Sequence, residues 1–514
     1  MDELLGKVLN IIEFRFPPLC DIAVLPFKKS LIEVMVELSK HHSELANNVS
    51  KEIDEIWKNL AERKILIKGR QPIIGVEKRL MEKIKSIEEY SPLRQNLEGL
   101  LYLDSESGIM RTYEVKSGVY YSPKEDWLRI RELINKDKKA KLFGKVERLN
   151  TYYAIIRSDA DNFGKIIRGN VKEGFRIKIE DYLCALLEGE AGEVIRATIE
   201  EKYGKAKELC EKNRIIDIDV KLKEIKDTIH ELKMREEIII SPSYHTALSK
   251  ALMKNAFKDV ETIEQHNGLV IYAGGDDLLA VMPVNECLDA VSELRKSFSF
   301  PLQNLGFYKI KEYFIPSLDT ASRSFSIYLG HYIFPMYIVM NRSAELLDEL
   351  AKKAKWMLHG VENRRKDTLI LAYSLRDGEQ SALLPLIDIR NPDEKLGDDV
   401  KKVKDLIELI DKPYVEAEFS SSLIYDLNRP EFVELLKLLI ENKEEYLLKK
   451  IIKNIFYRNC EVKGEEKRKK AEKKAEEFIT NYDLIFDING QSRFYLNELA
   501  TSLKLYISSL KEAA

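Results

Sequence analysis

One stretch near the middle of the chain constrains the fold more than any other. Apolar residues run from Leu269 to Met282 and are interrupted only by the Gly-Gly-Asp-Asp sequence at 274–277. This pattern fits a strand, a tight turn and a second strand, because glycine supplies the positive φ angles of a two-residue hairpin turn. Two adjacent carboxylates at such a tip repel one another unless a cation lies between them. Hard divalent ions such as Mg²⁺ take oxygen ligands and usually keep a substrate phosphate.

A second acidic stretch ends an earlier predicted strand. Residues 152–158 read as a strand, and Asp159 and Asp161 follow it. If this strand lies beside the hairpin, Asp159 meets Asp276 and Asp277 across neighbouring strands. Three converging carboxylates suit one or two metal ions that hold a nucleoside triphosphate. A Gly-Gly-Asp-Asp turn alone fits an ordinary solvated hairpin, and the second acidic stretch moves the balance toward a metal site.

Length and composition bound the class of protein. A chain of 514 residues exceeds one typical core and predicts two to four domains. Its 83 basic and 86 acidic residues nearly cancel, so the net charge of −3 gives no global reason to bind nucleic acid. The five cysteines contain no C-x-x-C pair, which argues against a zinc site and for a reducing cytoplasm. No apolar run reaches the roughly 18 residues of a membrane span, and the acidic N-terminus lacks a signal-peptide pattern, so we expect a soluble cytoplasmic protein.

The pattern of elements divides the chain into three predicted regions. Residues 1–149 read as a mixed, mainly helical region, and residues 391–514 as a helical domain rich in Lys and Glu. Residues 150–390 read as strand, helix, strand, strand, helix, strand, helix and strand, with a charge-dense helical insertion at 202–237. That order predicts a ferredoxin-like palm, so the expected fold class is α+β.

Several palm elements have clear boundaries in the sequence. Ser241-Pro242 marks a helix start and Asn267-Gly268 its end. The other predicted elements are helices at 179–199, 285–297 and 343–356, and strands at 324–332 and 368–373.

Two further patterns have simple explanations. His41 and His42 lie in a long helical run at 27–63 with no other His or Cys nearby, so a solvated helix explains them better than a metal site. The basic run Lys467–Lys474 is first a solvated helix face and second a candidate RNA- or protein-contacting face.

Four segments occur in an order that resembles a known family. They are residues 153–165 (YAIIRSDADNFGK), 243–260 (SYHTALSKALMKNAFKDV), 271–280 (IYAGGDDLLA) and 326–337 (SIYLGHYIFPMY). Together they resemble the large palm-bearing subunit of type III CRISPR effector complexes, closest to its Cmr branch. The resemblance is strong over about 150–375, weaker over the helical C-terminal region and poor over 1–150.

The resemblance implies a cyclase-type palm related to diguanylate and adenylate cyclases. Such a palm joins ATP molecules into cyclic oligoadenylates when the guide RNA of the complex pairs with a target RNA. The implied partners are the other subunits and, mostly indirectly, the guide and target RNA, with no membrane. Many family members carry an HD nuclease domain, but this chain has no His-Asp pair, so we expect no such DNase. Region 1–149 would be the remnant of a degenerate first palm.

The resemblance and the acidic stretches together nominate site residues. Asp159, Asp276 and Asp277 are the expected catalytic residues and ligands of Mg²⁺ or Mn²⁺, with the Ala160 carbonyl as a further ligand. ATP as substrate would contact a second set, comprising Gly274, Gly275, Asn162, Phe163, Gly164 and Lys355. Roles for Asp161, His245 and His331 are left open.

Two other functions compete with this one. A stand-alone cyclic-dinucleotide synthase would use the same acids, and GTP rather than ATP products would reveal it. A non-catalytic scaffold subunit would keep the motif by descent, although a scaffold needs no converging carboxylates. A template-directed polymerase is a distant third.

Overall fold

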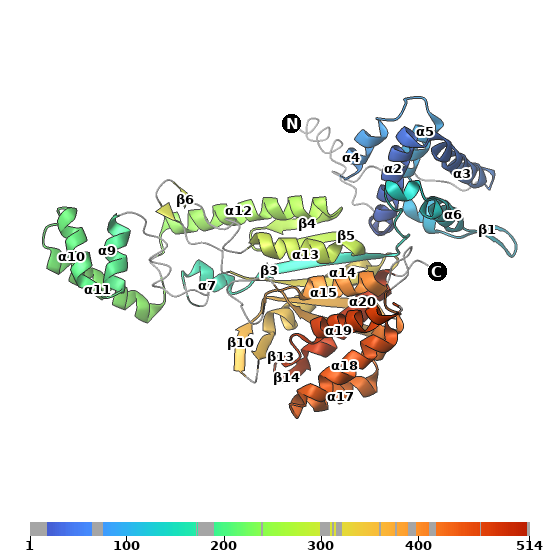
Figure 1. Ribbon diagram of the computed structural model, residues 1–514. Helices are drawn as coiled ribbons and strands as arrows, with labels where there is room; N and C mark the ends of the chain where they lie inside the picture. Colours follow the sequence, from blue (N-terminus) through green and yellow to red (C-terminus); the bar gives the residue numbers. More distant parts are fainter. Residues whose placement is uncertain are drawn as a thin grey trace.

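The protein consists of a central sheet domain, helical domains on either side of it in sequence, and a helical arm (Figure 1). The computed structural model describes residues 18–63, 76–170, 172, 190–237, 240–298, 309–310, 313–314, 321–358, 361–375, 378–388, 397–410, 418–462 and 464–510. In Figure 1 the arm and the N-terminal helices lie at opposite ends of the central sheet. No helix among these residues is both long and apolar enough to span a membrane.

The N-terminal helices surround a core of their own. The helical run predicted at 27–63 is confirmed as α2 (Leu19–His41) and α3 (Ser43–Glu62). The other members are α4 (Val76–Ile84), α5 (Pro92–Leu101) and α6 (Pro123–Lys136), and a short ribbon of β1 (Tyr113–Lys116) and β2 (Val119–Tyr121). Their apolar faces meet around Trp127, which is fully buried. His41 stacks on Phe143 with ring centroids 5.3 Å apart, so this histidine has a packing role.

The central sheet has six strands in the order β12-β11-β8-β3-β5-β4. Strand β3 pairs antiparallel with both β5 and β8, and β11 runs parallel to β8. This arrangement confirms the predicted palm. The strands are β3 (Tyr152–Ala160), β4 (Leu269–Gly274), β5 (Asp277–Pro283), β8 (Arg323–His331), β11 (Thr368–Leu375) and β12 (Gly378–Pro385).

Three helices cover this sheet in the predicted order. Helix α12 (Pro242–Gln265) packs on β4, α13 (Val284–Phe298) on β3, and α14 (Met336–Glu349) on β8. The start of α12 follows from its sequence, because Pro242 lies in its first turn and the Ser241 hydroxyl accepts a hydrogen bond from the Tyr244 amide at 3.2 Å. The element that precedes α12 in the chain is the last helix of the arm, so α12 is the first palm element after the arm.

The arm contains the predicted insertion at 202–237 together with a helix that precedes it, and it has its own small core. It contains α9 (Glu190–Ile199), α10 (Tyr203–Lys212) and α11 (Ile218–Arg235), packed around Ala206 and Cys210. The helix predicted at 179–199 is described only from residue 190, and its earlier part lies outside the described residues.

The C-terminal domain is not the nearly all-helical domain that we predicted. Strands β13 (Leu484–Ile488) and β14 (Gln491–Phe494) form a second sheet with β9 (Lys355–Leu358) and β10 (Val361–Arg365). The burial of 484–488 alternates as in a strand, but the segment is short and lies among charge-rich helical patterns, so its sequence did not reveal it. Those helices are α15 (Asp399–Ile410), α16 (Ser422–Leu427), α17 (Pro430–Glu441), α18 (Glu445–Asn459), α19 (Glu465–Ile479) and α20 (Tyr495–Leu510).

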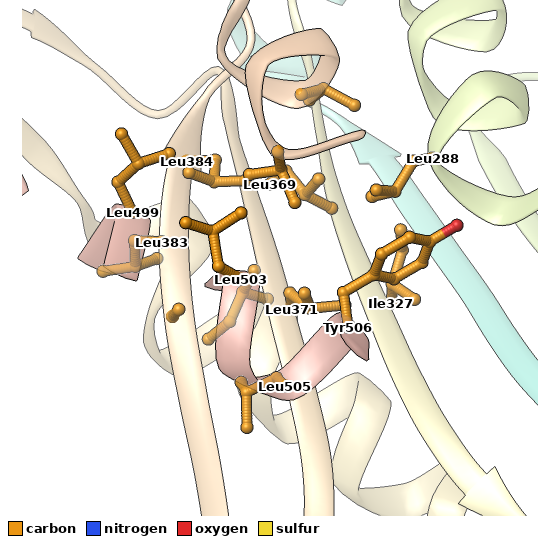
Figure 2. Packing of buried hydrophobic residues seen from close by; sticks show 14 of the residues in the cluster. Leu288, Ile327, Leu369, Leu371, Leu383, Leu384, Leu499, Leu503, Leu505 and Tyr506 are labelled. Carbon is orange, nitrogen blue, oxygen red and sulfur yellow. The ribbon is translucent and has the colours of Figure 1, made fainter. Parts of the chain in front are cut away.

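Helix α20 joins the C-terminal domain to the palm. Figure 2 shows its side chains Leu503 and Tyr506 lying against Leu371 of β11 and beside Leu383 of β12. The Tyr506 hydroxyl also donates to the Val284 carbonyl at the start of α13, at 3.1 Å. The palm and the C-terminal domain therefore share one continuous apolar core.

A buried ion pair fixes α13 to the sheet and yields a stability prediction. Arg295 donates to both carboxylate oxygens of Asp367 at 2.7 and 2.8 Å, and both side chains are almost fully buried. Arg295→Met should lower the free energy of unfolding by about 3–5 kcal/mol, because it leaves a buried charge uncompensated. Arg342→Met, which removes the exposed partner of Glu379, is the matched control and should cost no more than about 1 kcal/mol. Equal losses in urea denaturation would contradict the argument.

A half-buried histidine should make stability depend on pH. The two ring nitrogens of His266 lie 3.2 Å from carboxylate oxygens of Glu286 and Glu293. The hydrogen bond with Glu286, which outweighs burial, raises the pKa of His266 above its ordinary value. The stabilisation is therefore fully present below the unfolded pKa of about 6.5 and is lost as pH rises through the folded pKa. His266→Gln should remove this part of the pH dependence in unfolding curves recorded between pH 5.5 and pH 9, and an unchanged profile would refute it.

Candidate metal centre

The two glycines of the acidic hairpin have different tasks. Gly274 pairs with Asp277 as the last rung of β4 and β5, so the turn itself is Gly275 and Asp276. Only Gly275 has a positive φ, at 70°, so the expectation that both glycines supply positive angles is wrong for Gly274. Its Cβ would instead lie 2.1 Å from the hydroxyl of Tyr272, whose ring folds over it. One glycine permits the turn and the other makes room for an aromatic ring.

The three predicted acids come together at one edge of the sheet. Asp159 is the penultimate residue of β3, one position beyond the Ser158–Leu278 pair that joins this strand to β5. Asp159, Asp276 and Asp277 each offer a carboxylate oxygen, and these atoms lie within 4.8 Å of one another. We call these three residues the acidic cluster. The predicted convergence of Asp159 on the hairpin is thus confirmed.

The acidic cluster is electrostatically unfavourable on its own. Burial is the largest cause that raises the pKa of each of the three carboxyl groups. Repulsion adds to it, since the charge of Asp276 raises the pKa of Asp277 and that of Asp277 raises the pKa of Asp159. Burial and repulsion both disfavour the ionised carboxylates. A hard divalent cation, which takes oxygen ligands, would stabilise them.

One lysine already supplies positive charge to this cluster. The Lys352 ammonium donates to the Asp159 carboxylate and lies 3.6 Å from Asp348. Burial is the largest single influence and lowers the pKa of Lys352, but the hydrogen bond to Asp159 and the charges of the surrounding aspartates together outweigh it, so the pKa of Lys352 is raised. The sequence alone did not single out this residue, because the three closely spaced lysines at 352, 353 and 355 cannot be distinguished until the end of α14 is known.

Lys355, a predicted contact of ATP, lies in a strand rather than in the predicted helix. The predicted helix 343–356 ends at Glu349, and Lys355 begins strand β9, where it pairs with Asp487 of β13. The cause is the next residue, because Trp356 is fully buried and its indole donates to the Thr368 hydroxyl at 3.0 Å. The tertiary fold draws this segment into a second sheet, against the local helical pattern.

The remaining predicted nucleotide ligands lie just after Asp159. Ala160 ends β3, and its carbonyl stays a predicted metal ligand. Asn162 has a positive φ of 57° and precedes α7 (Phe163–Ile167), which also contains Gly164. Because α7 has only five residues, its N-terminus attracts phosphate only weakly, and contacts of Asn162, Phe163 and Gly164 with ATP stay predictions. Phe163 packs against the small core under the hairpin.

Asp161 has a structural rather than a catalytic environment. Its carboxylate is buried and accepts hydrogen bonds from the hydroxyls of Ser322 and Ser324 at 2.6 and 2.8 Å, and from the Asp367 amide at 2.9 Å. The two histidines whose roles were left open lie away from the acidic cluster. His331 contacts the ring of Tyr152 at the far end of β3, and His245 lies in the first turn of α12.

A second buried ion pair lies near the acidic cluster and adds positive charge to its surroundings. Arg323 begins β8 opposite Ala160, and its guanidinium donates to Asp259 of α12 at 2.6 Å. Its charge opposes the rise in pKa of Asp276 and Asp277. Arg323 is fully buried between the rings of Phe298 and Phe325, so it acts on the acids through space.

Comparison with known proteins gives a family match over a segment that contains the acidic hairpin. Residues 217–357 match the family described as Cas10/Cmr2, second palm domain. The expected resemblance to the palm subunit of the Cmr branch is therefore confirmed, and so is the α+β palm fold with its flanking domains.

Similarity to known proteins extends beyond residues 217–357. The chain is 28% identical over 365 residues to the CRISPR system CMR subunit Cmr2 of Saccharolobus solfataricus, covering 60% of this chain and 34% of the relative. It is 30% identical over 138 residues to Cmr2 of Pyrococcus furiosus, covering 27% of this chain and 14% of the relative. The chain thus spans about a third or less of the length of these relatives.

Two solved structures share the fold over nearly the whole chain. One is titled as the apo state of the type III-B Cmr-beta complex, with a TM-score of 0.62, 21% identity and coverage of 98% of this chain and 48% of that one. The other is titled as Cmr-beta bound to cognate target RNA, with a TM-score of 0.62, 20% identity and coverage of 99% and 50%.

The turn glycine generates a prediction about metal affinity. Gly275→Ala should lower stability by about 1 kcal/mol, because an L-residue is strained at φ 70°. It should also weaken Mn²⁺ binding, since the turn places Asp276 and Asp277. Gly118→Ala is the matched control, because Gly118 has a similar φ of 75° in a turn outside the palm. It should lose similar stability in urea denaturation and keep its Mn²⁺ affinity in calorimetry. Equal Mn²⁺ affinities in the two variants would contradict the role of the turn.

Proposed function

We propose that this chain serves as the palm-bearing subunit of a type III CRISPR effector complex and joins ATP molecules into cyclic oligoadenylates once target RNA is bound. The observation that carries the proposal is the convergence of Asp159, Asp276 and Asp277 from neighbouring strands. The Cas10/Cmr2 match over 217–357 and the likeness to Cmr complexes, one of them titled as bound to target RNA, support it. The implied partners are the other subunits and, through them, guide and target RNA.

The residues of the cluster fit a hard divalent cation. All three ligands are carboxylates, their pKa values are raised, and one of them has already recruited an ammonium group. When bound, Mg²⁺ or Mn²⁺ would activate a ribose hydroxyl and neutralise the triphosphate. Asp276 and Asp277 on the turn and Asp159 on β3 would fix the position of the reacting groups. Among the described residues Lys352 is the cation in contact with the cluster, so it replaces Lys355 as the candidate for binding the triphosphate.

The central experiment removes two carboxylates. Asp276→Asn with Asp277→Asn should reduce cyclic oligoadenylate formation at least about a hundredfold in the assembled complex, because two metal ligands are lost. Binding of target RNA should not change. Glu345→Gln with Glu349→Gln is the matched control, since it removes two exposed acids from α14 and should leave product formation intact. Mass spectrometry of the products, with and without complementary RNA, is the measurement.

The competing functions give different outcomes in this assay. Products made from GTP without any RNA would identify a stand-alone cyclic-dinucleotide synthase. A complex that binds no ATP in the presence of Mg²⁺ would identify a scaffold subunit. Unchanged ATP products from the double aspartate variant would refute the metal centre itself.

A further inference from the structure

Lys352 stands on an anchored turn beside the acidic cluster. It is the middle residue of the short 3₁₀ turn η4 (Ala351–Lys353) between α14 and β9. Ala351 and Ala354, on either side of it, are fully buried, so the backbone of this turn is held in place. The lysine side chain is 21% exposed, and its four-carbon stem can carry the ammonium group to other positions.

This ammonium group binds a carboxylate that a metal ion would also use as a ligand. It contacts Oδ2 of Asp159, one of the three residues whose oxygens lie close enough to share one ion. Lys352 and a divalent cation therefore compete for the same carboxylate. No other ammonium or guanidinium group of the described chain forms an ion pair with the acidic cluster, because Arg323 is engaged by Asp259.

The charges determine the result of this competition. With one lysine on three carboxylates, the cluster keeps a formal charge of −2 when all three are ionised. A divalent cation alone would displace the ion pair with Asp159 and leave the partly buried ammonium with the more distant and exposed carboxylate of Asp348, 3.6 Å away. A cation that arrives with a polyphosphate brings a new partner, because phosphate oxygens accept hydrogen bonds from lysine.

We propose that Lys352 is a resident counter-ion, which disfavours divalent metal alone and favours metal together with a polyphosphate. This inference rests on the proposed function and extends it to the order of loading. The lysine transfers from Asp159 to the polyphosphate when the metal–nucleotide enters. The ligand class that the site selects is therefore a metal-complexed nucleoside polyphosphate rather than a free ion.

The test measures binding in the full chain, without turnover. Mn²⁺ is titrated alone and then with an ATP analogue that has a methylene group between the α and β phosphorus atoms, with free Mn²⁺ followed by electron paramagnetic resonance. Lys352→Gln should bind Mn²⁺ alone about threefold more tightly than the unmodified chain, as expected when a partly exposed competing charge is lost. The same variant should bind Mn²⁺ with the analogue about threefold more weakly, so the analogue no longer enhances metal binding.

Two matched variants separate this role from general charge effects. Lys353→Gln removes the neighbouring lysine, which pairs with Glu349 on the surface, and should change neither affinity. Lys352→Arg keeps a cation at the position and should preserve the low affinity for Mn²⁺ alone.

The outcomes distinguish this inference from the function beneath it. If Asp276→Asn with Asp277→Asn abolishes Mn²⁺ binding while Lys352→Gln binds Mn²⁺ alone no better than the unmodified chain, the counter-ion role is overturned and the metal centre stands. If the unmodified chain binds Mn²⁺ neither alone nor with the analogue, both proposals are overturned.

Discussion

Repulsion among three carboxylates at one edge of a sheet is the constraint on which this structure depends. Such a group persists only where the rest of the fold forces its members together. Here the register between β3 and β5 places Asp159 opposite the hairpin, and the turn at Gly275 carries the other two acids. The folding free energy of the palm compensates for the repulsion, which is the arrangement that the proposed cation site requires.

The buried polar groups around the cluster explain why it does not relax. Asp161 joins the end of β3 to β8 and to the start of β11 through three hydrogen bonds. The Arg323–Asp259 pair joins α12 to β8, and the Arg295–Asp367 pair joins α13 to β11. Each of these contacts would be costly to break, because a buried charge would lose its partner. The strand ends that carry the acids are thus held from several directions.

Local patterns predicted the palm and the convergence of its acids. The alternation around 269–282, the strand before Asp159 and the cap signals of α12 are encoded within short windows, and all three were found in the structure. The same acidic stretch could not show that Asp159 and Asp161 have different fates. That difference arises where β3 ends and the Asp161 amide donates to the Ser322 carbonyl, which turns its carboxylate into the interior.

The failures occurred where distant segments decide the local structure. Trp356 is buried beside Phe486, in a strand some 130 residues later that we did not predict, and this pairing converts an expected helix into β9. Because of this error, the sequence analysis chose Lys355, whereas Lys352 is the lysine that contacts the acidic cluster. Strand β12 escaped notice because its first residues are polar and exposed, and its partner is recognisable only from the hairpin it forms with β11.

The packing of α20 against β11 and β12 has a consequence for synthesis in the cell. A ribosome releases β3 on the order of tens of seconds before residues 495–510 emerge. Until then the faces of β11 and β12 shown in Figure 2 have no cover, so the nascent palm presents an apolar surface to its surroundings. The sheet that carries the acidic cluster therefore completes its folding late in translation, and during that interval it is a natural substrate for chaperones that bind exposed apolar segments.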